Sequence, residues 1–212
     1  MVELPILNLS KGLEKMKVHI DLTLVRDSDI NQNFILSDLY SKIHIAFVAN
    51  KDSRGNSPVA VAFPKYSMKD HSLGGVIRLM AESEGALKDL NLSECFGGSK
   101  TYVRMSEIKP IPSNIDRYVR YQRVTKKPNN EKRARRICRN KDLDYNEVLN
   151  RLNSEQSQRQ KDIKEPFVWM VSNSNKNRFP LFIKEVIMNE AGYDQVELSC
   201  YGLSSKGSLP MF

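Results

Sequence analysis

The sequence contains little cysteine and histidine, and it has no long run of apolar residues. Its 212 residues include three cysteines, which are far apart and odd in number. This pattern argues against a disulfide framework and against a zinc site of the CxxC type. The three histidines lack metal-ligand spacing, and no segment approaches the roughly 20 apolar residues of a membrane-spanning helix. We therefore expect neither a bound metal nor a membrane partner.

Common signatures of nucleotide binding and nucleophilic catalysis are also missing. The sequence contains no GxxxxGKS/T, GxGxxG or GxSxG motif. Its first residues, Met1 to Pro5, carry an early acid and no basic stretch, so they predict no secretory signal. Together with the few cysteines, this favours a cytoplasmic protein, and an enzyme with this sequence is expected to need no cofactor.

The positive charge is concentrated in one segment. Between Arg117 and Lys141 the sequence holds 11 basic residues and a single acid, Glu131. The chain has 33 basic and 25 acidic residues in all, so 22 and 24 lie elsewhere, and the net charge of +8 comes from this segment. A charge this local indicates a site for a polyanion.

Part of this segment predicts a helix with two distinct faces. Asn129 or Asn130 can cap its start, and Glu131 in the first turn suits the helix dipole. One face carries four cations at helical spacing: Lys132, Arg135, Arg136 and Arg139. The opposite face can pack on a core through Ala134, Ile137 and Cys138. We expect no acid one turn away to relieve the repulsion among the four cations.

Three interpretations of the basic helix are open. Most charge runs are solvated helix faces, and this one fits that description as well. An anionic partner would relieve the repulsion, and nucleic acid is the favoured one. An acidic membrane surface is less favoured, because the apolar face is too small to insert into lipid.

The first half of the chain predicts an α+β domain. Strands and helices alternate in the order βαββαβ: Lys17–Val25, Asn33–Ala49, Pro58–Phe63, Gly75–Glu82, Glu84–Leu90 and Lys100–Ile108. This is the order of the ferredoxin-like motif, a four-stranded antiparallel sheet with two helices on one face. No aromatic-rich strand of the RNA-recognition type is evident, so the basic helix is expected to be the main RNA contact.

The second half begins after a proline-rich boundary at Pro110–Asn114. A second helix is predicted around Asp144–Leu152, followed by a polar, mobile stretch over Asn153–Lys164. Three strands are then predicted, and a glycine- and serine-rich loop follows them: Phe167–Val171, Arg178–Met188 and Gln195–Tyr201, then Tyr201–Ser208.

Several of these segments, taken in order, resemble a known family. They are the ferredoxin-like half, the arginine-rich helix, the segment Phe167-Val168-Trp169-Met170-Val171-Ser172-Asn173-Ser174, and Cys200-Tyr201-Gly202-Leu203-Ser204 before the final Pro210-Met211-Phe212. This set resembles the subtype I-F (Csy-type) CRISPR repeat-processing endoribonucleases. The resemblance covers the chain from Lys17 onward. It implies a ferredoxin-like domain at 17–112, an RNA-binding C-terminal α+β domain at 113–212 and an added segment at 1–16.

The resemblance implies a metal-independent cut at the base of a repeat hairpin. In such proteins the 2′-hydroxyl upstream of the scissile phosphate is the nucleophile, and the products carry a 2′,3′-cyclic phosphate and a 5′-hydroxyl. The protein supplies alignment, a proton acceptor and charge stabilisation. The implied partners are the CRISPR repeat RNA and the other subunits of a type I-F effector complex, in which the protein stays bound to its product.

The resemblance also assigns roles to individual residues. His44 matches the catalytic histidine, Ser172 the serine that holds the 2′-hydroxyl, and Tyr201 the tyrosine that orients the histidine. Considered alone, a helical histidine is more often structural, Ser172 ends a strand, and Tyr201 suits a buried strand. His19 on the polar face of a strand and His71 in a polar loop are not expected to compete with His44.

RNA contacts are implied for a second set of residues. Phe179 matches an aromatic that stacks under the stem, Arg123 an arginine that recognises guanine, and Ser174 an assisting serine. The basic helix contributes Arg136 and Arg139, flanked by Arg135 and Lys132. Two positions depart from the family: Thr125 replaces a glutamine, and Asn140 replaces the second arginine of a pair. A threonine is too short for a bidentate contact with adenine.

The active site is expected where the two halves meet. Two alternatives stay open: a non-catalytic RNA-binding subunit of a ribonucleoprotein, and a general binder of double-stranded RNA. The nuclease should prefer one hairpin strongly, whereas the general binder should show little preference for sequence.

Overall fold

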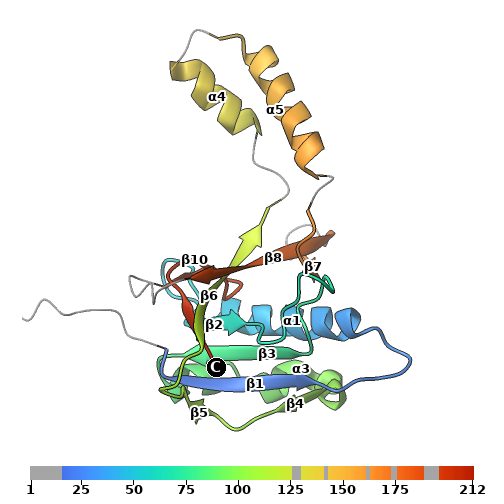
Figure 1. The fold of residues 1–212 in the computed structure, drawn as a ribbon, viewed down its shortest axis with the longest axis vertical. Helices are drawn as coiled ribbons and strands as arrows, with labels where there is room; N and C mark the ends of the chain where they lie inside the picture. The colour runs from blue at the N-terminus through green and yellow to red at the C-terminus, as the bar shows by residue number, and fades with distance from the viewer. Residues whose placement is uncertain (1–15, 126–129, 141–142, 161–162, 173–175, 189–195) are drawn as a thin grey trace, which may run out of the picture.

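The computed structural model describes residues 16–125, 130–140, 143–160, 163–172, 176–188 and 196–212. Two sheets and the helix α1 (Gln32–Ala49) form a body, and a pair of helices projects from it (Figure 1). The fold is α+β, as predicted. Among the described residues, no helix combines the length and the apolar character needed to cross a bilayer.

The first sheet has its strands in the order β2-β3-β1-β4, and every pair is antiparallel. These strands are β1 (Val18–Leu24), β2 (Val59–Ala62), β3 (Val76–Ala81) and β4 (Val103–Met105). A two-residue strand, β5 (Lys109–Pro110), also pairs with β1. The short helices α2 (Glu84–Lys88) and α3 (Leu92–Phe96) follow β3. The predicted strand Lys100–Ile108 was too long, because a 3₁₀ helix begins at Gly97, where φ is +49°, and continues to Tyr102.

The helix α1 is confirmed almost residue for residue. Its start is capped by Asn31, whose side-chain oxygen accepts from the Asn33 amide at 2.8 Å, and it ends at Asn50. The predicted apolar face is buried: Leu36, Leu39, Tyr40, Ile43 and Phe47. This face fixes the rotation of α1 about its axis, and therefore also the direction in which His44 points.

The second sheet has the order β11-β6-β8-β7, again antiparallel throughout. Strands β7 (Phe167–Val171) and β8 (Arg178–Met188) lie where they were predicted. Strands β6 (Arg117–Val124) and β11 (Leu209–Met211) were missed, and β6 places the first three arginines of the basic segment on a strand. The prediction of a strand over Gln195–Tyr201 was wrong for its last residues. Of the described part of that range, β9 (Glu197–Leu198) alone is a strand, and it pairs with β10 (Ser204–Lys206) around a turn; Gln195 lies outside the described residues.

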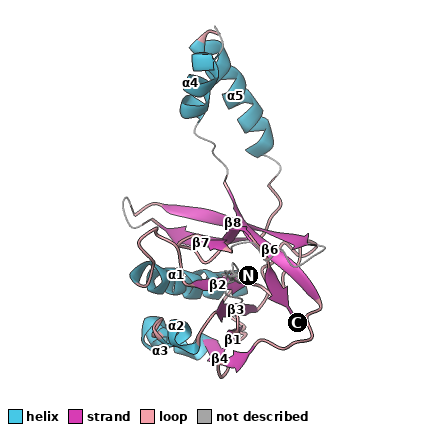
Figure 2. Cartoon of the chain, turned by 90° about the vertical axis from the view of Figure 1, so that its left-hand side faces the viewer, coloured by secondary structure: helices cyan, strands magenta, loops and turns pink. Residues whose placement is uncertain are grey.

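One continuous core joins the two sheets and α1. Tyr121 of β6 is fully buried, and its hydroxyl donates to the Phe63 carbonyl at 2.9 Å. Arg78 of β3 makes two hydrogen bonds to the Asp21 carboxylate, at 2.7 and 2.9 Å, and a third to the Phe212 carbonyl at 3.0 Å. The contacts of Tyr121 with Phe63 and of Arg78 with Phe212 join the two sheets, and Figure 2 shows the sheets stacked, with α1 beneath β7 and above α2 and α3.

The helices α4 (Asn130–Asn140) and α5 (Tyr145–Gln160) form the projecting pair. They share a small cluster of their own, with Ala134, Val148 and Leu152 buried in it. Asn130 donates to Asn153 at 2.8 Å, and Asp144 caps α5 by accepting from the Glu147 amide at 2.9 Å. Most of the polar stretch predicted over Asn153–Lys164 is helical, because α5 continues to Gln160 with no glycine or proline to stop it, and residues 161–162 lie outside the described residues.

Candidate active site and nucleic-acid interface

The basic helix has the two faces that the sequence predicted. Its four cations are exposed: Lys132, Arg135, Arg136 and Arg139. On the other side Ala134 is fully buried, while Ile137 and Cys138 are half-buried against α5. The expectation that no acid relieves the repulsion was wrong, because Glu131 lies 3.7 Å from the Arg135 guanidinium, one turn away. Both partners are exposed, so this ion pair is worth only about 0.3–0.5 kcal/mol and leaves the stripe basic.

The arginines of β6 have different surroundings. Arg120 donates to the Gly207 carbonyl at 2.6 Å and so ties β6 to the C-terminal segment. Arg123 is exposed, and its guanidinium carbon lies 5.2 Å from the ring centre of Tyr201 and 5.8 Å from that of Phe179. Arg123 therefore joins the same group of side chains as Tyr201 and Phe179, which the sequence alone did not indicate.

His44 and Tyr201 form a stacked pair of rings. The ring centres are 4.3 Å apart and the planes are inclined by 11°. His44 comes from α1, and Tyr201 from the turn between β9 and β10, so the pair joins the two halves of the chain. Both side chains are half-buried, which leaves part of the imidazole open to solvent.

A backbone hydrogen bond determines which nitrogen of His44 carries the proton. The Nδ1 atom lies 2.9 Å from the Cys200 carbonyl oxygen. A carbonyl can only accept, so Nδ1 is the donor, and the neutral imidazole keeps its lone pair on Nε2. Burial lowers the pKa of His44 below the usual 6.5, against a smaller opposing effect of the Cys200 hydrogen bond. His44 is therefore a neutral ring at pH 7 with a proton acceptor at Nε2.

The turn that carries Tyr201 is held rigidly against α1 and β2. The Tyr40 hydroxyl donates to the Tyr201 carbonyl at 2.8 Å, and the Val61 amide donates to the Gly202 carbonyl at 2.9 Å. Gly202 has φ of +70°, and an added Cβ would lie 2.6 Å from Phe47 and 2.7 Å from Val61. Only glycine satisfies both the backbone conformation and the space at this position. Tyr40 and Gly202 are supporting residues that the sequence analysis did not identify.

Ser172 directly follows β7, which lies alongside α1. The Trp169 amide donates to the Ser37 hydroxyl at 2.9 Å, and the Ser41 hydroxyl lies 3.6 Å from the Met170 sulfur. The two elements therefore run side by side in the same direction. His44 lies about one turn after Ser41 on α1, and Ser172 follows Met170 by two residues, directly after β7. Its amide donates to the Asn177 carbonyl at 2.9 Å, which places Ser172 in the turn from β7 to β8. Ser174 lies outside the described residues.

Comparison with known proteins shows to which family this chain is related. The family model described as "CRISPR-associated protein (Cas_Csy4)" matches residues 19–212. The chain belongs to this family. A curated relative, the "CRISPR-associated endonuclease Cas6/Csy4" of Pseudomonas aeruginosa (strain UCBPP-PA14), is 29% identical over 201 residues. The alignment covers 93% of this chain and 100% of that relative.

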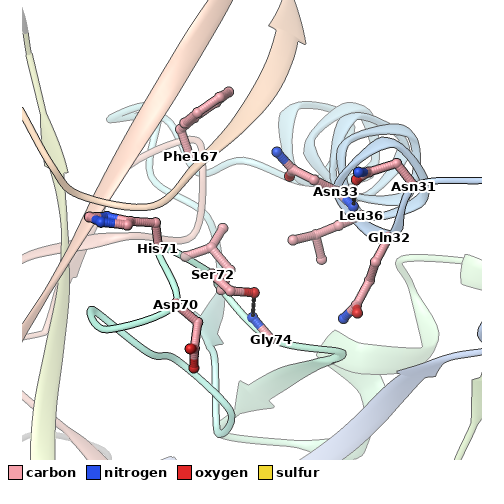
Figure 3. Close-up of a pocket in the computed structure, with 10 residues that line it drawn as sticks. Asn31, Gln32, Asn33, Leu36, Asp70, His71, Ser72, Gly74 and Phe167 are labelled. Atoms are coloured by element: carbon pink, nitrogen blue, oxygen red, sulfur yellow. Dashed lines mark hydrogen bonds between the residues drawn. The ribbon is translucent and has the colours of Figure 1, made fainter.

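The other two histidines of this Csy4-family chain lie elsewhere. The polar face on which His19 was placed is covered: His19 is 8% exposed, its ring packs edge-on against Phe212 at 4.9 Å, and burial lowers its pKa. His71 is exposed, with Nδ1 2.7 Å from the Lys164 carbonyl. It lines a polar pocket of about 210 Å³ at the start of α1, where Asn33 and Phe167 also lie (Figure 3). Among the residues that the structure describes, no three His, Cys, Asp or Glu side chains gather to hold a metal ion.

The two departures from the Csy4 pattern lie at the ends of their elements. Thr125 is exposed directly after β6, two residues from Arg123. Asn140 is the last residue of α4, one position after Arg139.

Proposed function

We propose that this protein is a metal-independent endoribonuclease that processes CRISPR repeat transcripts. It binds the repeat hairpin, cuts at the base of the stem and stays bound to the product in a type I-F effector complex. The observation that carries this proposal is the neutral His44 ring, held by the Cys200 carbonyl and the Tyr201 ring with Nε2 as a proton acceptor. Family membership supports it, since the relative is named an endonuclease.

In the proposed reaction the RNA supplies the nucleophile. The 2′-oxygen attacks the adjacent phosphorus as its proton passes to Nε2 of His44, and the bond from phosphorus to the 5′-oxygen breaks. The 5′-oxygen takes up a proton, and the products are a 2′,3′-cyclic phosphate and a 5′-hydroxyl. Ser172 holds the 2′-hydroxyl in line, and Tyr201 keeps the imidazole in its orientation.

Two groups of residues contact the RNA in this proposal. The exposed stripe of α4 contacts the stem through Arg136 and Arg139, with Arg135 and Lys132 at its sides. Arg123 and Thr125 lie at the foot of the stem, and Phe179 and Ser174 complete the contact there. The proximity of the Arg123 guanidinium to Tyr201 and Phe179 supports a recognition site close to the cut.

The proposed layout has a ferredoxin-like domain at 17–112, an RNA-binding domain at 113–212 and an added segment at 1–16. The strand order β2-β3-β1-β4 and the antiparallel pairing support the ferredoxin-like assignment. The continuous core joins the first domain to the sheet of the second, while α4 and α5 have a cluster of their own.

The test uses a repeat hairpin in EDTA, beside a copy with one 2′-deoxy substitution upstream of the expected cut. Cleavage of the first and tight binding without cleavage of the second are expected. If both RNAs bind tightly and neither is cut, the protein is a non-catalytic RNA-binding subunit and the roles given to His44, Ser172 and Tyr201 are wrong. Weak, unselective binding of both would favour a general binder of double-stranded RNA.

A further inference from the structure

The outer face of β7 and β8 carries aromatic side chains that the core does not use. Along β7, Val168 and Met170 point into the core and are almost fully buried. The alternate residues, Phe167, Trp169 and Val171, therefore point to the other face, where Val171 is 55% exposed and the two aromatic rings are half-buried. No aromatic-rich strand of the RNA-recognition type was evident from the sequence, but β7 carries two aromatic rings two residues apart.

The rings on this face are arranged as a platform. Phe167 packs edge-on against Trp169 with ring centres 5.4 Å apart, and it also contacts Phe182 of β8 at 5.3 Å. Phe182 pairs with Phe167 in the sheet, so it lies beside Phe167 on the same face, where it is 7% exposed. Phe167 is thereby held between Trp169 and Phe182, and both Phe167 and Trp169 remain half-buried.

A cation completes the platform. Arg178 pairs with Val171 across the strands, and its guanidinium carbon lies 4.7 Å from the ring centre of Trp169. Arg178 is exposed and lies over the face of the Trp169 ring, so it presents a positive charge to solvent at that face. Aromatic rings on a strand with an adjacent arginine are the usual elements of single-stranded RNA recognition, in which bases stack and phosphates pair with the cation.

The position of this face relates it to the proposed cut. Trp169 is three residues before Ser172 on β7, which corresponds to about 10 Å along a strand. The sheet lies at the end of the body from which α4 and α5 project, so its outer face is turned toward the basic helix (Figures 1 and 2). Unpaired RNA that continues from the foot of a stem at Ser172 would therefore have Trp169 and Arg178 within reach of its first nucleotides.

We propose that Trp169 and Arg178 form a binding site for an unpaired nucleotide that flanks the hairpin. The base stacks on Trp169 and its phosphate pairs with Arg178. This inference rests on the proposed function for the position of the stem, and it adds a contact outside the hairpin itself. The nucleotide comes either from the 5′ flank or from the 3′ flank, and both are single strands that leave the stem at its base.

The experiment measures affinity for four RNAs, all with the 2′-deoxy substitution that prevents cleavage: the bare hairpin, hairpins with a short 5′ or 3′ flank, and a flanked hairpin with an abasic flank. We expect one flank to tighten binding by roughly 5- to 150-fold, the range of a single base stack. The abasic flank carries the same phosphates and should lose most of this gain. Trp169 is the one tryptophan of the chain, so its fluorescence reports the stacking directly.

Variants separate stacking from charge. Trp169→Leu should abolish the gain from the flank while leaving affinity for the bare hairpin unchanged, and Trp169→Phe should restore most of it. Arg178→Ala should reduce the gain, whereas Arg104→Ala, which removes an equally exposed arginine from β4, should not. The equal affinity of each variant for the bare hairpin is the check that it folds.

The outcomes distinguish this inference from the proposed function. If the wild-type protein binds the bare hairpin tightly but no flank improves affinity, the flank site is wrong and the proposed function stands. The flank site is also overturned if the gain persists in Trp169→Leu or with the abasic flank. If the bare hairpin does not bind at all, the proposed function itself has failed.

Discussion

The body and the α4–α5 pair differ in how much holds them together. In the body, side chains as large as Tyr40, Tyr121 and Phe47 are fully buried in one core that joins α1 to both sheets. The apolar cluster of the pair, among the residues that the structure describes, consists of Ala134, Val148 and Leu152 with a few half-buried neighbours around them. The rings of the proposed catalytic group stand on the first region, and the basic stripe stands on the second. The proposed chemistry is thus assigned to the region with the large core, and the proposed RNA binding to the region with the small one.

This difference has a physical reason. Proton transfer depends on geometry, so a misplacement of about 1 Å is costly, and a fixed core supplies that accuracy. Binding of a phosphate backbone depends mainly on charge, and it tolerates adjustment of the helix that carries the cations. A helix of 11 residues such as α4 is marginal alone, so its packing on α5 is what presents the stripe.

The largest effect should follow from removing the proton acceptor in the body. We expect His44→Ala to slow single-turnover cleavage by about 10²–10⁴-fold, the usual contribution of a general base, while hairpin affinity changes little. Quench kinetics with enzyme in excess, together with filter binding, measure the two quantities separately. Loss of binding with intact cleavage of the bound RNA would show that His44 contributes to RNA binding and not to the chemistry.

The next largest effect concerns the small cluster between α4 and α5. Leu152→Ala should destabilise the pair by about 2–5 kcal/mol, enough to unfold it locally and weaken RNA binding. The thermal midpoint of the body should stay the same. Hydrogen exchange resolves the two regions, since protection should be lost in α4 and α5 alone. Leu79→Ala is the matched variant in the body, and it should lower the midpoint without changing exchange in the pair. A joint loss of protection in both regions after Leu152→Ala would mean that they are one cooperative unit.

A smaller effect is expected from single cations of the stripe. Arg136→Ala should weaken hairpin binding by about 1.5–3 kcal/mol if it pairs with a phosphate or a base, and saturating protein should restore the cleavage rate. The slope of log affinity against log salt should also decrease in magnitude by about one for a phosphate contact. Arg133→Ala is the control, because Arg133 shares the helix but lies off the four-residue stripe. Equal losses of affinity in both variants would indicate that the overall positive potential of the helix, rather than defined contacts, binds the RNA.

The smallest effect is a change in the titration of His44. Tyr201→Ala uncovers the imidazole, so its pKa should rise toward 6.5, because burial is the main cause of the lowering. A base whose pKa is lower stays unprotonated to lower pH, so the acid limb of the cleavage profile should move to higher pH in the variant. NMR titration of the His44 ring checks the free protein. Tyr201→Phe keeps the stacked ring, and it should leave the pKa near that of the wild type.

The elements predicted correctly are those whose pattern is local. Alternating or helical apolar spacing was sufficient for β1, α1, β7 and β8. Strand β6 was missed because its arginines dominated the interpretation, although Val119 and Tyr121 alternate with them and are fully buried. Strand β11 is three residues long and exists by pairing with β6, so nothing near it in the sequence predicts it.

The candidate site was predictable only in part for a related reason. The assignment of His44, Ser172 and Tyr201 came from the family resemblance, since each has an ordinary structural explanation when taken singly. The contacts that support the ring pair join residues more than 150 positions apart, from Tyr40 to the Tyr201 carbonyl and from His44 to the Cys200 carbonyl. Backbone acceptors leave no signal in a sequence, because every residue type offers one.

The hydrogen bond from His44 to the Cys200 carbonyl has a consequence for how this site can evolve. The acceptor that fixes the tautomer of the imidazole is the main-chain carbonyl at position 200. The side chain at that position is therefore free to vary without loss of the tautomer. Two positions later the opposite holds, because Gly202 has no room for a single carbon. In a library of all single substitutions, position 200 should therefore tolerate many side chains and position 202 should tolerate none but glycine, although Tyr201 alone separates them. Mutational tolerance at this site follows the path of the backbone rather than the distance from the reacting atoms.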